Sequence, residues 1–107
     1  MKINKILKYI GENNSMYRNY KGIYEIDDNN LRQGIWELYY SNGKLKRKGN
    51  YKNGIYDGYW EEYFSNGQLQ SKGNYINGKL EGYWEYFYSN GNMLYKGNYV
   101  NGVHYEN

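Results

Sequence analysis

Apolar and polar positions repeat with a period of 24 residues over most of the chain. Trp36 recurs as Trp60 and Trp84, each two positions after a glycine, and an Asn-Gly pair occurs twice in every unit, first at 42–43 and again at 53–54. Between these pairs, apolar and polar residues alternate as they do in half-buried strands. Asn-Gly flanked by such alternation is the strongest short-range signal for a β-hairpin. The pattern therefore predicts a continuous antiparallel meander.

A two-residue turn at 42–43 would fix the register of the first unit. Ser41 then faces Lys44, and Tyr40 faces Leu45. Every tryptophan faces a glycine, which leaves room for the indole over bare backbone; the pairs are Trp36–Gly49, Trp60–Gly73 and Trp84–Gly97. On the other face carboxylates oppose lysines, in the pairs Glu37–Lys48, Glu61–Lys72 and Glu85–Lys96. A slip of one residue would destroy both sets of pairs.

The alternation assigns the side chains to two faces. The first carries most of the large apolar residues, and we expect it to be the core or the concave side; its members are Trp36, Tyr40, Leu45, Tyr51, Trp60, Phe64, Leu69, Tyr75, Trp84, Tyr88, Met93 and Tyr99. The second carries the Glu–Lys pairs and is more polar, although it also holds Tyr39, Tyr63, Phe87 and Leu94. A chain this short buries only a modest share of its surface, so one aromatic face has to serve as the core.

The two ends of the chain depart from the repeat. Ile3, Ile6, Leu7 and Ile10 follow the spacing of an amphipathic helix, which predicts a capping helix over 1–12. The remaining segments, all in one domain, are a degenerate half-repeat at 16–33, three repeats at 34–57, 58–81 and 82–102, and a tail at 103–107. The tail supplies only a partial strand, which predicts an open C-terminal edge for self-association or for a partner's strand.

Composition narrows the class of protein. Aromatic residues make up 21% of the chain and include 17 tyrosines, while proline is absent. The net charge of +3 is too small to identify a nucleic-acid binder. The absence of cysteine excludes disulfides and thiolate metal sites. Residues 1–10 make a poor signal peptide, and no segment reaches the roughly 20 apolar residues of a membrane span, so we expect a cytoplasmic protein.

The unit G-x-W-x-x-[YF]-x-S-N-G-x-[LM]-x-x-K-G-N-Y-x-N-G resembles the MORN repeat, and more closely the bacterial variant of that repeat. The match in the first unit rests on Gly34, Trp36, Tyr39, Gly43, Leu45, Gly49, Tyr51 and Gly54, and it recurs in the next two. The resemblance implies a curved, single-layer array of hairpins that serves as a scaffold or binding module. Some relatives of the variant are antitoxin-like or immunity-like partners of a toxin. A weaker resemblance, to choline-binding cell-wall repeats, leaves out the Lys-Gly-Asn-Tyr half of the unit.

The residues that could carry catalysis are few and scattered. His104 is the only histidine, and it lies in the C-terminal tail with no cysteine to activate. Glu37, Glu61 and Glu85 each have a lysine in the opposing strand, so surface ion pairs explain them better than acid–base chemistry. The acidic pair at 27–28 falls well short of a calcium loop. We therefore expect no enzyme activity, no cofactor and no metal site.

The remaining candidates are binding residues. Tyrosine gives a large, rigid contact area with a polar tip, and one strand carries a run of basic residues; the candidate partner-binding residues are Tyr39, Tyr63, Phe87, Lys46, Arg47 and Lys48. The tryptophans and the glycines that face them are assigned to the fold instead; these are Trp36, Trp60, Trp84, Gly49, Gly73 and Gly97.

The leading functional hypothesis is a non-enzymatic protein-binding or scaffold module, with a toxin among the partner classes. It would use its aromatic face or its open C-terminal edge, and the same edge could join two copies into a homo-oligomer. One alternative is peripheral attachment to anionic phospholipid through the lysines and the amphipathic N-terminal segment. The other is a carbohydrate- or choline-binding repeat protein that stacks its ligand on the tryptophans. Nucleic acid is the partner class that the charge favours least.

Overall fold

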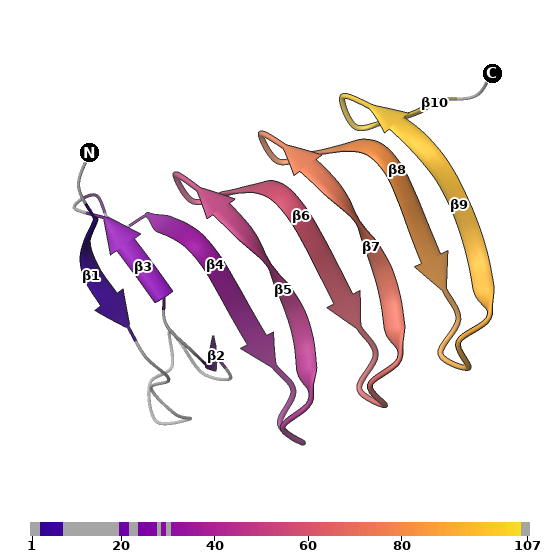
Figure 1. Ribbon diagram of the computed structural model, residues 1–107, viewed down its shortest axis with the longest axis horizontal. Helices are drawn as coiled ribbons and strands as arrows, with labels where there is room; N and C mark the ends of the chain where they lie inside the picture. The colour runs from indigo at the N-terminus through magenta and orange to yellow at the C-terminus, as the bar shows by residue number, and fades with distance from the viewer. Residues whose placement is uncertain (1–2, 8–19, 22–23, 28, 30, 106–107) are drawn as a thin grey trace.

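The computed structural model describes residues 3–7, 20–21, 24–27, 29 and 31–105. Within them, ten strands form one open antiparallel sheet in the order β1-β3-β4-β5-β6-β7-β8-β9-β10, with β2 paired to β4 (Figure 1). The strands are β1 (Ile3–Leu7), β2 (Tyr20–Lys21), β3 (Tyr24–Asp27), β4 (Arg32–Tyr39), β5 (Leu45–Lys52), β6 (Ile55–Tyr63), β7 (Leu69–Ile76), β8 (Lys79–Phe87), β9 (Met93–Val100) and β10 (Val103–Tyr105). Extents of 45 × 34 × 16 Å are those of a single layer, so the predicted mainly β, single-layer meander is confirmed.

One of the two turns in each unit is a two-residue hairpin turn. Asn53, Asn77 and Asn101 have φ angles of 54°, 51° and 54°, and the glycine after each also has a positive φ. Positive φ at both central residues defines a type I′ turn, whose twist matches that of the flanking strands. Each turn is also tied to the preceding repeat, as when the Gly54 amide donates a hydrogen bond to the Arg32 carbonyl at 2.9 Å.

The other turn, at Asn42-Gly43, has three loop residues instead of the predicted two. The Tyr40 amide donates to the Lys44 carbonyl at 2.8 Å, and the Gly43 amide donates to the Tyr40 carbonyl at 2.9 Å. Gly43 has a positive φ of 89°, whereas Asn42 does not have one. This is the three-residue hairpin loop in which a type I turn ends on a left-handed glycine. Tyr40 therefore closes the loop against Lys44, and the predicted Ser41–Lys44 pair is wrong.

The longer loop changes the pairing beside it and leaves the rest of the register intact. Tyr39, rather than the predicted Tyr40, pairs with Leu45. A bulge then adds one residue on β5 and restores the offset, so Trp36 faces Gly49 as predicted. The other predicted pairs are confirmed in the same way: Glu37–Lys48, Trp60–Gly73, Glu61–Lys72, Trp84–Gly97 and Glu85–Lys96.

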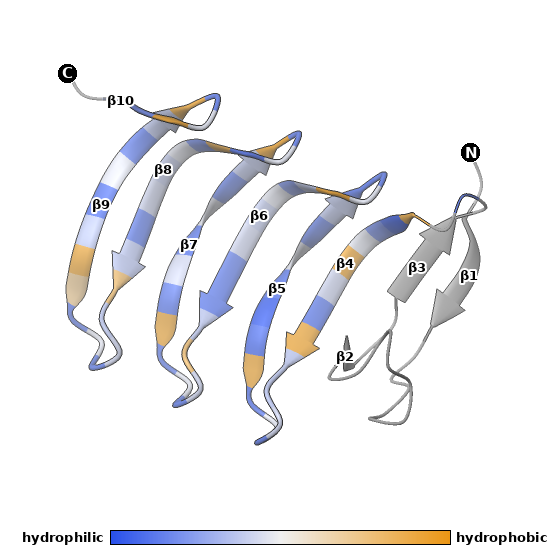
Figure 2. Cartoon of the chain, turned by 180° about the vertical axis from the view of Figure 1, so that it is seen from behind, coloured by the Kyte–Doolittle hydropathy of each residue, from blue (hydrophilic) through white to orange (hydrophobic). Residues whose placement is uncertain are grey.

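The shifted pairs move three side chains to the other face. Directly opposed residues of an antiparallel pair share a face, and the pairs here are Tyr39–Leu45, Tyr63–Leu69 and Phe87–Met93. The predicted place of Leu45, Leu69 and Met93 beside the tryptophans is therefore wrong. In Figure 2 strongly hydrophobic residues lie at the starts of β5, β7 and β9 and at the turns of the opposite end, whereas the middle of these three strands is pale or blue. The middle of the sheet is accordingly held by aromatic rather than aliphatic side chains.

The predicted N-terminal helix is wrong where the structure describes it. Ile3–Leu7 forms β1, which pairs antiparallel with β3. A short helix must first form a costly nucleus, whereas the edge of β3 offers ready hydrogen-bond partners to a segment that contains β-branched isoleucine. The rest of the predicted helix at 1–12 lies outside the described residues.

The segment between β1 and β4 pairs with the first full repeat. In β2, Lys21 lies opposite Glu37, just as Lys48 of β5 lies opposite Glu61 of the next unit. In β3, Glu25 lies opposite Gln33. Both short strands therefore run along the same edge of β4, the position that β5 takes beside β6. Residues 16–19, 22–23, 28 and 30 of the predicted half-repeat lie outside the described part.

Candidate functional site

The tryptophan face is formed by Trp36, Trp60 and Trp84 together with the aromatic residues around them. The three indoles are only 1%, 3% and 3% exposed. Trp60 covers Gly49 of the preceding strand so closely that a Cβ atom at Gly49 would lie 2.0 Å from Cδ2 of the indole. Trp84 covers Gly73 in the same way, at 2.2 Å. Each of these rings thus covers the glycine of the preceding strand, not the one across its own hairpin, and only glycine fits beneath it.

A β-bulge beside each covered glycine provides a backbone carbonyl that accepts a hydrogen bond from the indole N–H. The register between β5 and β6 shifts between Gly49 and Tyr51, and the Asn50 carbonyl accepts a hydrogen bond from Nε1 of Trp60 at 2.9 Å. Nε1 of Trp84 donates to the Asn74 carbonyl at the same distance. A bulge disrupts the ladder locally and leaves a backbone group unpaired. The buried indole N–H is thereby satisfied, as buried polar groups need to be.

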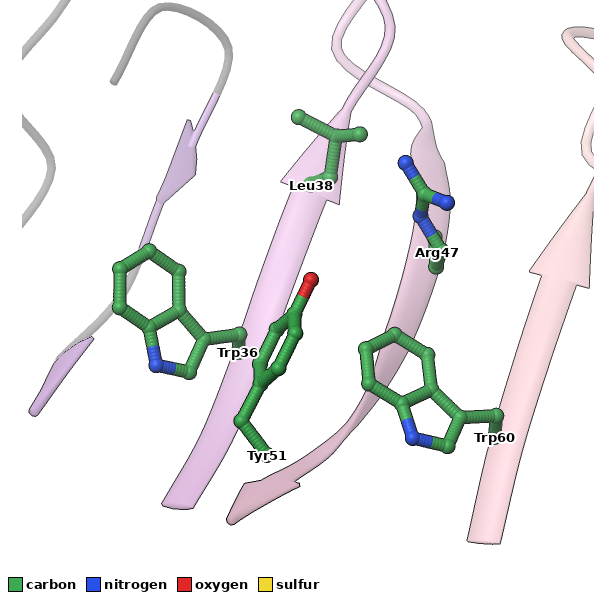
Figure 3. A pocket seen from close by; sticks show the side chains of 5 residues that line it. All are labelled: Trp36, Leu38, Arg47, Tyr51 and Trp60. Carbon is green, nitrogen blue, oxygen red and sulfur yellow. The ribbon is translucent and has the colours of Figure 1, made fainter. Parts of the chain in front are cut away.

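Ring contacts run without a break along this face. Tyr51 stands between Trp36 and Trp60, edge-on to both, with ring centroids 5.9 Å and 5.1 Å apart (Figure 3). Tyr56 stacks on Trp60 at 4.0 Å. The series then continues through Tyr75, Trp84, Tyr86 and Tyr95 to His104. Aromatic pairs of this kind add about 0.5–1.5 kcal/mol beyond the burial of their area, so this face serves as the core.

The cavity between these rings and β5 is too small for a ligand. A cavity of about 10 Å³ is lined by Trp36, Leu38, Arg47, Tyr51 and Trp60 (Figure 3). That volume is close to the least, about 10–15 Å³, that a single water molecule needs. A sugar ring or a quaternary ammonium group does not fit there, and the buried indoles offer no open surface for stacking. The carbohydrate and choline alternative therefore loses the surface on which it depends.

The structure separates the basic residues that the sequence places in a run. Nζ of Lys46 lies 5.5 Å from the centre of the Tyr40 ring. Nζ of Lys48 lies 3.5 Å from a carboxylate oxygen of Glu37 on the more polar face. Arg47 points to the tryptophan face (Figure 3). The three cations have different partners and form no single positive surface, which weakens the electrostatic case for lipid attachment.

Arg47 belongs to the packing of the tryptophan face. Its guanidinium donates a hydrogen bond to the Tyr56 hydroxyl at 2.6 Å and lies 3.7 Å from the Glu62 carboxylate. Burial raises the pKa of Tyr56, and the positive charge of Arg47 opposes that rise. The side chain therefore links β5 to β6 at the border of the aromatic core.

The opposite face carries several large side chains that are open to solvent. We name it the tyrosine–glutamate face, and its members are Ile35, Glu37, Tyr39, Tyr59, Glu61, Tyr63, Tyr83, Glu85 and Phe87. Ile35, Tyr59 and Tyr83 occupy the same position of successive repeats, on β4, β6 and β8, and they are 52%, 47% and 48% exposed. Single exposed apolar residues are ordinary. Three such residues in register on alternate strands form a regular row that a single partner can contact together.

Glutamates hold the tyrosines of this face in place. Each carboxylate accepts a hydrogen bond from a tyrosine two residues away on its own strand, in the pairs Tyr39–Glu37 (2.7 Å), Tyr59–Glu61 (2.9 Å), Tyr63–Glu61 (2.7 Å) and Tyr83–Glu85 (3.0 Å). Desolvation, together with the hydrogen bond to the carboxylate and its charge, raises the pKa of Tyr39, Tyr59 and Tyr63 to about 12. The bonds also fix the rings, which lowers the entropy that a binding surface loses when it is ordered.

A shallow depression lies between two members of the exposed row. Its volume is about 320 Å³, and its lining consists of Ile35, Lys48, Gly49, Asn50, Tyr59 and Glu61. Gly49 has no side chain, so backbone forms part of the floor. The volume lies at the lower end of the range for ligand pockets, about 300–1,000 Å³. The depression can therefore receive one large side chain of a partner. The Lys48 ammonium and the Glu61 carboxylate lie at its border.

The predicted partner-binding residues are divided between the two faces. Tyr39, Tyr63 and Phe87 lie half-buried on the tyrosine–glutamate face, while Arg47 lies on the other. The exposed row of Ile35, Tyr59 and Tyr83 is absent from the predicted set. A signal for it exists in the sequence, because a large residue stands immediately before the tryptophan in every unit.

The part of the chain that the structure describes holds neither a metal cluster nor a membrane-spanning helix. No group of three or more His, Cys, Asp or Glu side chains is placed there to hold a metal ion. Among those same residues, no helix has the length and apolar character that crossing a membrane requires.

A sheet of repeated hairpins with an aromatic core face and an open opposite face defines a β-hairpin repeat protein. A family model described as the MORN repeat variant matches residues 32–53, 56–77 and 80–101, and the chain therefore belongs to the MORN repeat family. Each match begins 24 residues after the previous one, in agreement with the sequence period. Members of this family are generally binding modules, and this chain is a repeat-based binding module. Comparison with curated proteins and with solved structures gave no match.

Proposed function

We propose that this chain is a non-enzymatic protein-binding module whose contact surface is the tyrosine–glutamate face. The observation that carries the proposal is the exposed row of Ile35, Tyr59 and Tyr83, each about half open to solvent. Tyrosine is enriched among the residues that dominate protein–protein affinity. The tryptophan face is filled by its own rings and is less available to a partner.

The geometry of the row suggests the shape of the partner. Its members stand on alternate strands, and neighbouring strands are about 4.7–4.9 Å apart, so successive members are about 10 Å apart. Three members then span about 20 Å, which is the length of an extended segment of about six residues. A partner segment that crosses the strands and offers a large apolar side chain to the depression beside Tyr59 fits this surface.

A toxin is the partner class to test first, with this chain acting as its antitoxin or immunity protein. The support is the resemblance of the repeat unit to the bacterial variant found among antitoxin-like and immunity-like proteins. Neutralisation by binding requires only that the toxin's working surface be occupied, so a module without catalytic groups can perform it.

Affinity capture from native lysate tests the proposal with three forms of the chain: the wild type, the double variant Tyr59→Ser/Tyr83→Ser, and Tyr88→Ser. Tyr88 is 52% exposed and lies in a turn outside the row, so it is a matched control. We expect one protein to be retained by the wild type and by the control and to be lost from the double variant. Identical captured proteins from all three forms would contradict the proposal. Flotation with phosphatidylserine vesicles is the parallel arm, and vesicle binding without protein capture would favour the lipid alternative.

A further inference from the structure

Glu61 stands in the middle of the tyrosine–glutamate face with a lysine on each neighbouring strand, yet it forms an ion pair with neither. It lies opposite Lys48 of β5 and opposite Lys72 of β7. Nζ of Lys48 instead lies 3.5 Å from a carboxylate oxygen of Glu37, and Nζ of Lys72 lies 3.4 Å from one of Glu85. Within the part of the chain that the structure describes, Glu61 therefore makes no ion pair.

Sequence differences between the repeats explain why the lysines pair with the other two glutamates. Glu61 accepts hydrogen bonds from two tyrosine hydroxyls, one on each of its oxygens. In each of the other two repeats an apolar residue, Ile35 or Phe87, stands where one of these tyrosines would be. Glu37 and Glu85 therefore each accept one such bond, and the lysine approaches the oxygen that remains.

The depression between Ile35 and Tyr59 consequently has one negative charge that is not balanced. Lys48 and Glu61 are the charged residues of its lining, and the Lys48 ammonium is already balanced by Glu37. A carboxylate can accept at about four lone-pair positions, so acceptor positions remain free on Glu61 after the two tyrosine hydrogen bonds. The border of the depression thus offers a carboxylate to an incoming cation.

We infer that the depression receives an arginine of the partner protein, whose guanidinium pairs with Glu61. A guanidinium presents paired donors to a carboxylate and also stacks on aromatic rings, and the ring of Tyr59, 47% exposed, lines the same depression. The stem of arginine packs along apolar surface while its head stays polar, so the stem is the apolar part that enters beside Ile35. The inference rests on the proposed protein-binding function and names the chemistry of the residue that this surface recognises.

Two other occupants fit the depression less well. An acidic side chain would compete with Glu37 for the Lys48 ammonium and would be repelled by Glu61. A second copy of this chain would have to supply an arginine. In the described part of the chain, Arg32 and Arg47 both lie against aromatic rings of the tryptophan face. The charges therefore favour a basic segment of a different protein.

Titration of the full chain with two matched peptides tests this inference. The probe is a six-residue serine peptide with arginine at its second position and leucine at its fifth, about 10 Å apart when extended, as successive members of the row are. The control peptide carries citrulline, which has the shape of arginine without its charge. NMR amide shifts around Gly49 and Tyr59 should saturate with the arginine peptide, and the citrulline peptide should bind at least about tenfold more weakly, because charge-assisted hydrogen bonds are the stronger ones.

Charge changes in opposite directions separate recognition from damage to the fold. Glu61→Gln should weaken the arginine peptide by a similar factor and leave the citrulline peptide unchanged. Glu62→Gln is the matched control, because it removes the same charge from the same strand on the tryptophan face, and it should change neither peptide. Lys48→Gln should strengthen the arginine peptide, a gain that a damaged fold does not produce. Equal binding of the two peptides, or no saturable shift at Gly49 and Tyr59, would overturn the inference.

Affinity capture separates this inference from the function on which it rests. A protein that is lost from Tyr59→Ser/Tyr83→Ser but retained by Glu61→Gln would overturn the arginine contact and leave the protein-binding face in place. Loss of that protein from both variants, with its retention by Glu62→Gln, would support the contact. A wild-type dimer in sedimentation that Glu61→Gln dissociates would also overturn the inference, because a second copy would then be the occupant.

Discussion

Trp60 lies over Gly49 of the neighbouring strand, and the two residues belong to different repeats. A repeat of this kind cannot bury its tryptophan by itself, so the indole is buried only when the preceding hairpin supplies a bare glycine and a bulged carbonyl. Stability in such arrays is a sum of repeat and interface contributions. The Trp–Gly contact recurs as Trp60 over Gly49 and Trp84 over Gly73, and it sets the expected effect of substitutions at these glycines.

Gly73→Ala should destabilise the chain strongly, and Gly97→Ala should not. The new Cβ at Gly73 would lie 2.2 Å from the Trp84 ring, which is buried against Tyr75 and Tyr86, whereas at Gly97 it meets the ends of His104 and Tyr95. Overpacking of a closed site costs about 1–3 kcal/mol, and we expect a value near the top of that range for Gly73. Urea unfolding measures both variants. Equal losses would mean that the indole does not require a bare glycine.

The tryptophan emission should not respond to sugars or choline. All three indoles are buried, and each N–H donates to a backbone carbonyl. Quenching by acrylamide should accordingly be weak in the folded chain and should become strong on unfolding. A saturable change of emission during titration with a sugar or with choline would restore the lectin alternative.

Stability should fall as the pH rises from about 10 to about 12. The pKa of Tyr59 and Tyr63 is raised from the ordinary value of 10.0 to about 12 in the folded chain. In that window the unfolded chain loses protons that the folded chain retains, so the contribution to stability is complete below pH 10 and is lost as the pH passes the folded pKa. Chemical unfolding at a series of alkaline pH values measures this effect.

Glu61→Gln should move the titration of the same two tyrosines back toward its ordinary range. Glu61 accepts a hydrogen bond from each hydroxyl, and its charge opposes ionisation of both. Part of the rise comes from desolvation, and that part should remain. Tyrosinate absorbance during alkaline titration distinguishes the variants, and Glu81→Gln serves as a control outside these pairs. An unchanged titration would exclude the carboxylate as a cause.

Asn77→Ala should cost about 1–2 kcal/mol, the penalty for an alanine in the left-handed region, while Asn77→Gly should be nearly neutral. Asn77 has a φ of 51° in its type I′ turn. Asn66→Ala tests the other turn, in which the asparagine has no positive φ. That residue instead accepts a hydrogen bond from the Gln68 amide and donates one to the Ser89 carbonyl. Asn66→Gly should therefore be no more stable than Asn66→Ala. Thermal unfolding of these two variants and of the two Asn77 variants measures the difference.

The sequence predicts the sheet because three local signals agree. Asn-Gly pairs, alternation and the Trp–Gly spacing all indicate the same meander, and the pairs between Trp36 and Gly49 and between Glu37 and Lys48 are confirmed. The predicted register of these pairs is correct because two unpredicted features compensate for each other. The loop after Tyr40 is one residue longer than an Asn-Gly pair suggests, and a bulge on β5 adds the compensating residue. Alternation alone carries no information about a bulge.

The N-terminal strand and the exposed row were harder to foresee. Ile3, Ile6 and Leu7 have helical spacing, yet they lie in a strand that pairs with β3. The hydrogen bonds that β3 offers to this strand cannot be predicted from the spacing of apolar residues. Ile35, Tyr59 and Tyr83 stand beside the tryptophans in sequence, yet their exposure depends on how far the neighbouring strands' side chains cover them. That coverage is a property of the packed sheet.

Site-specific photo-crosslinking tests the central claim most directly. A photoreactive phenylalanine analogue is placed at position 59 or at position 88 of the full chain, and the crosslinked products are identified from the cells that make the protein. Both positions hold exposed tyrosines. A protein-binding tyrosine–glutamate face should give one crosslinked protein from position 59 and none from position 88. Products from position 88 alone, or lipid adducts in place of protein at position 59, would contradict the account.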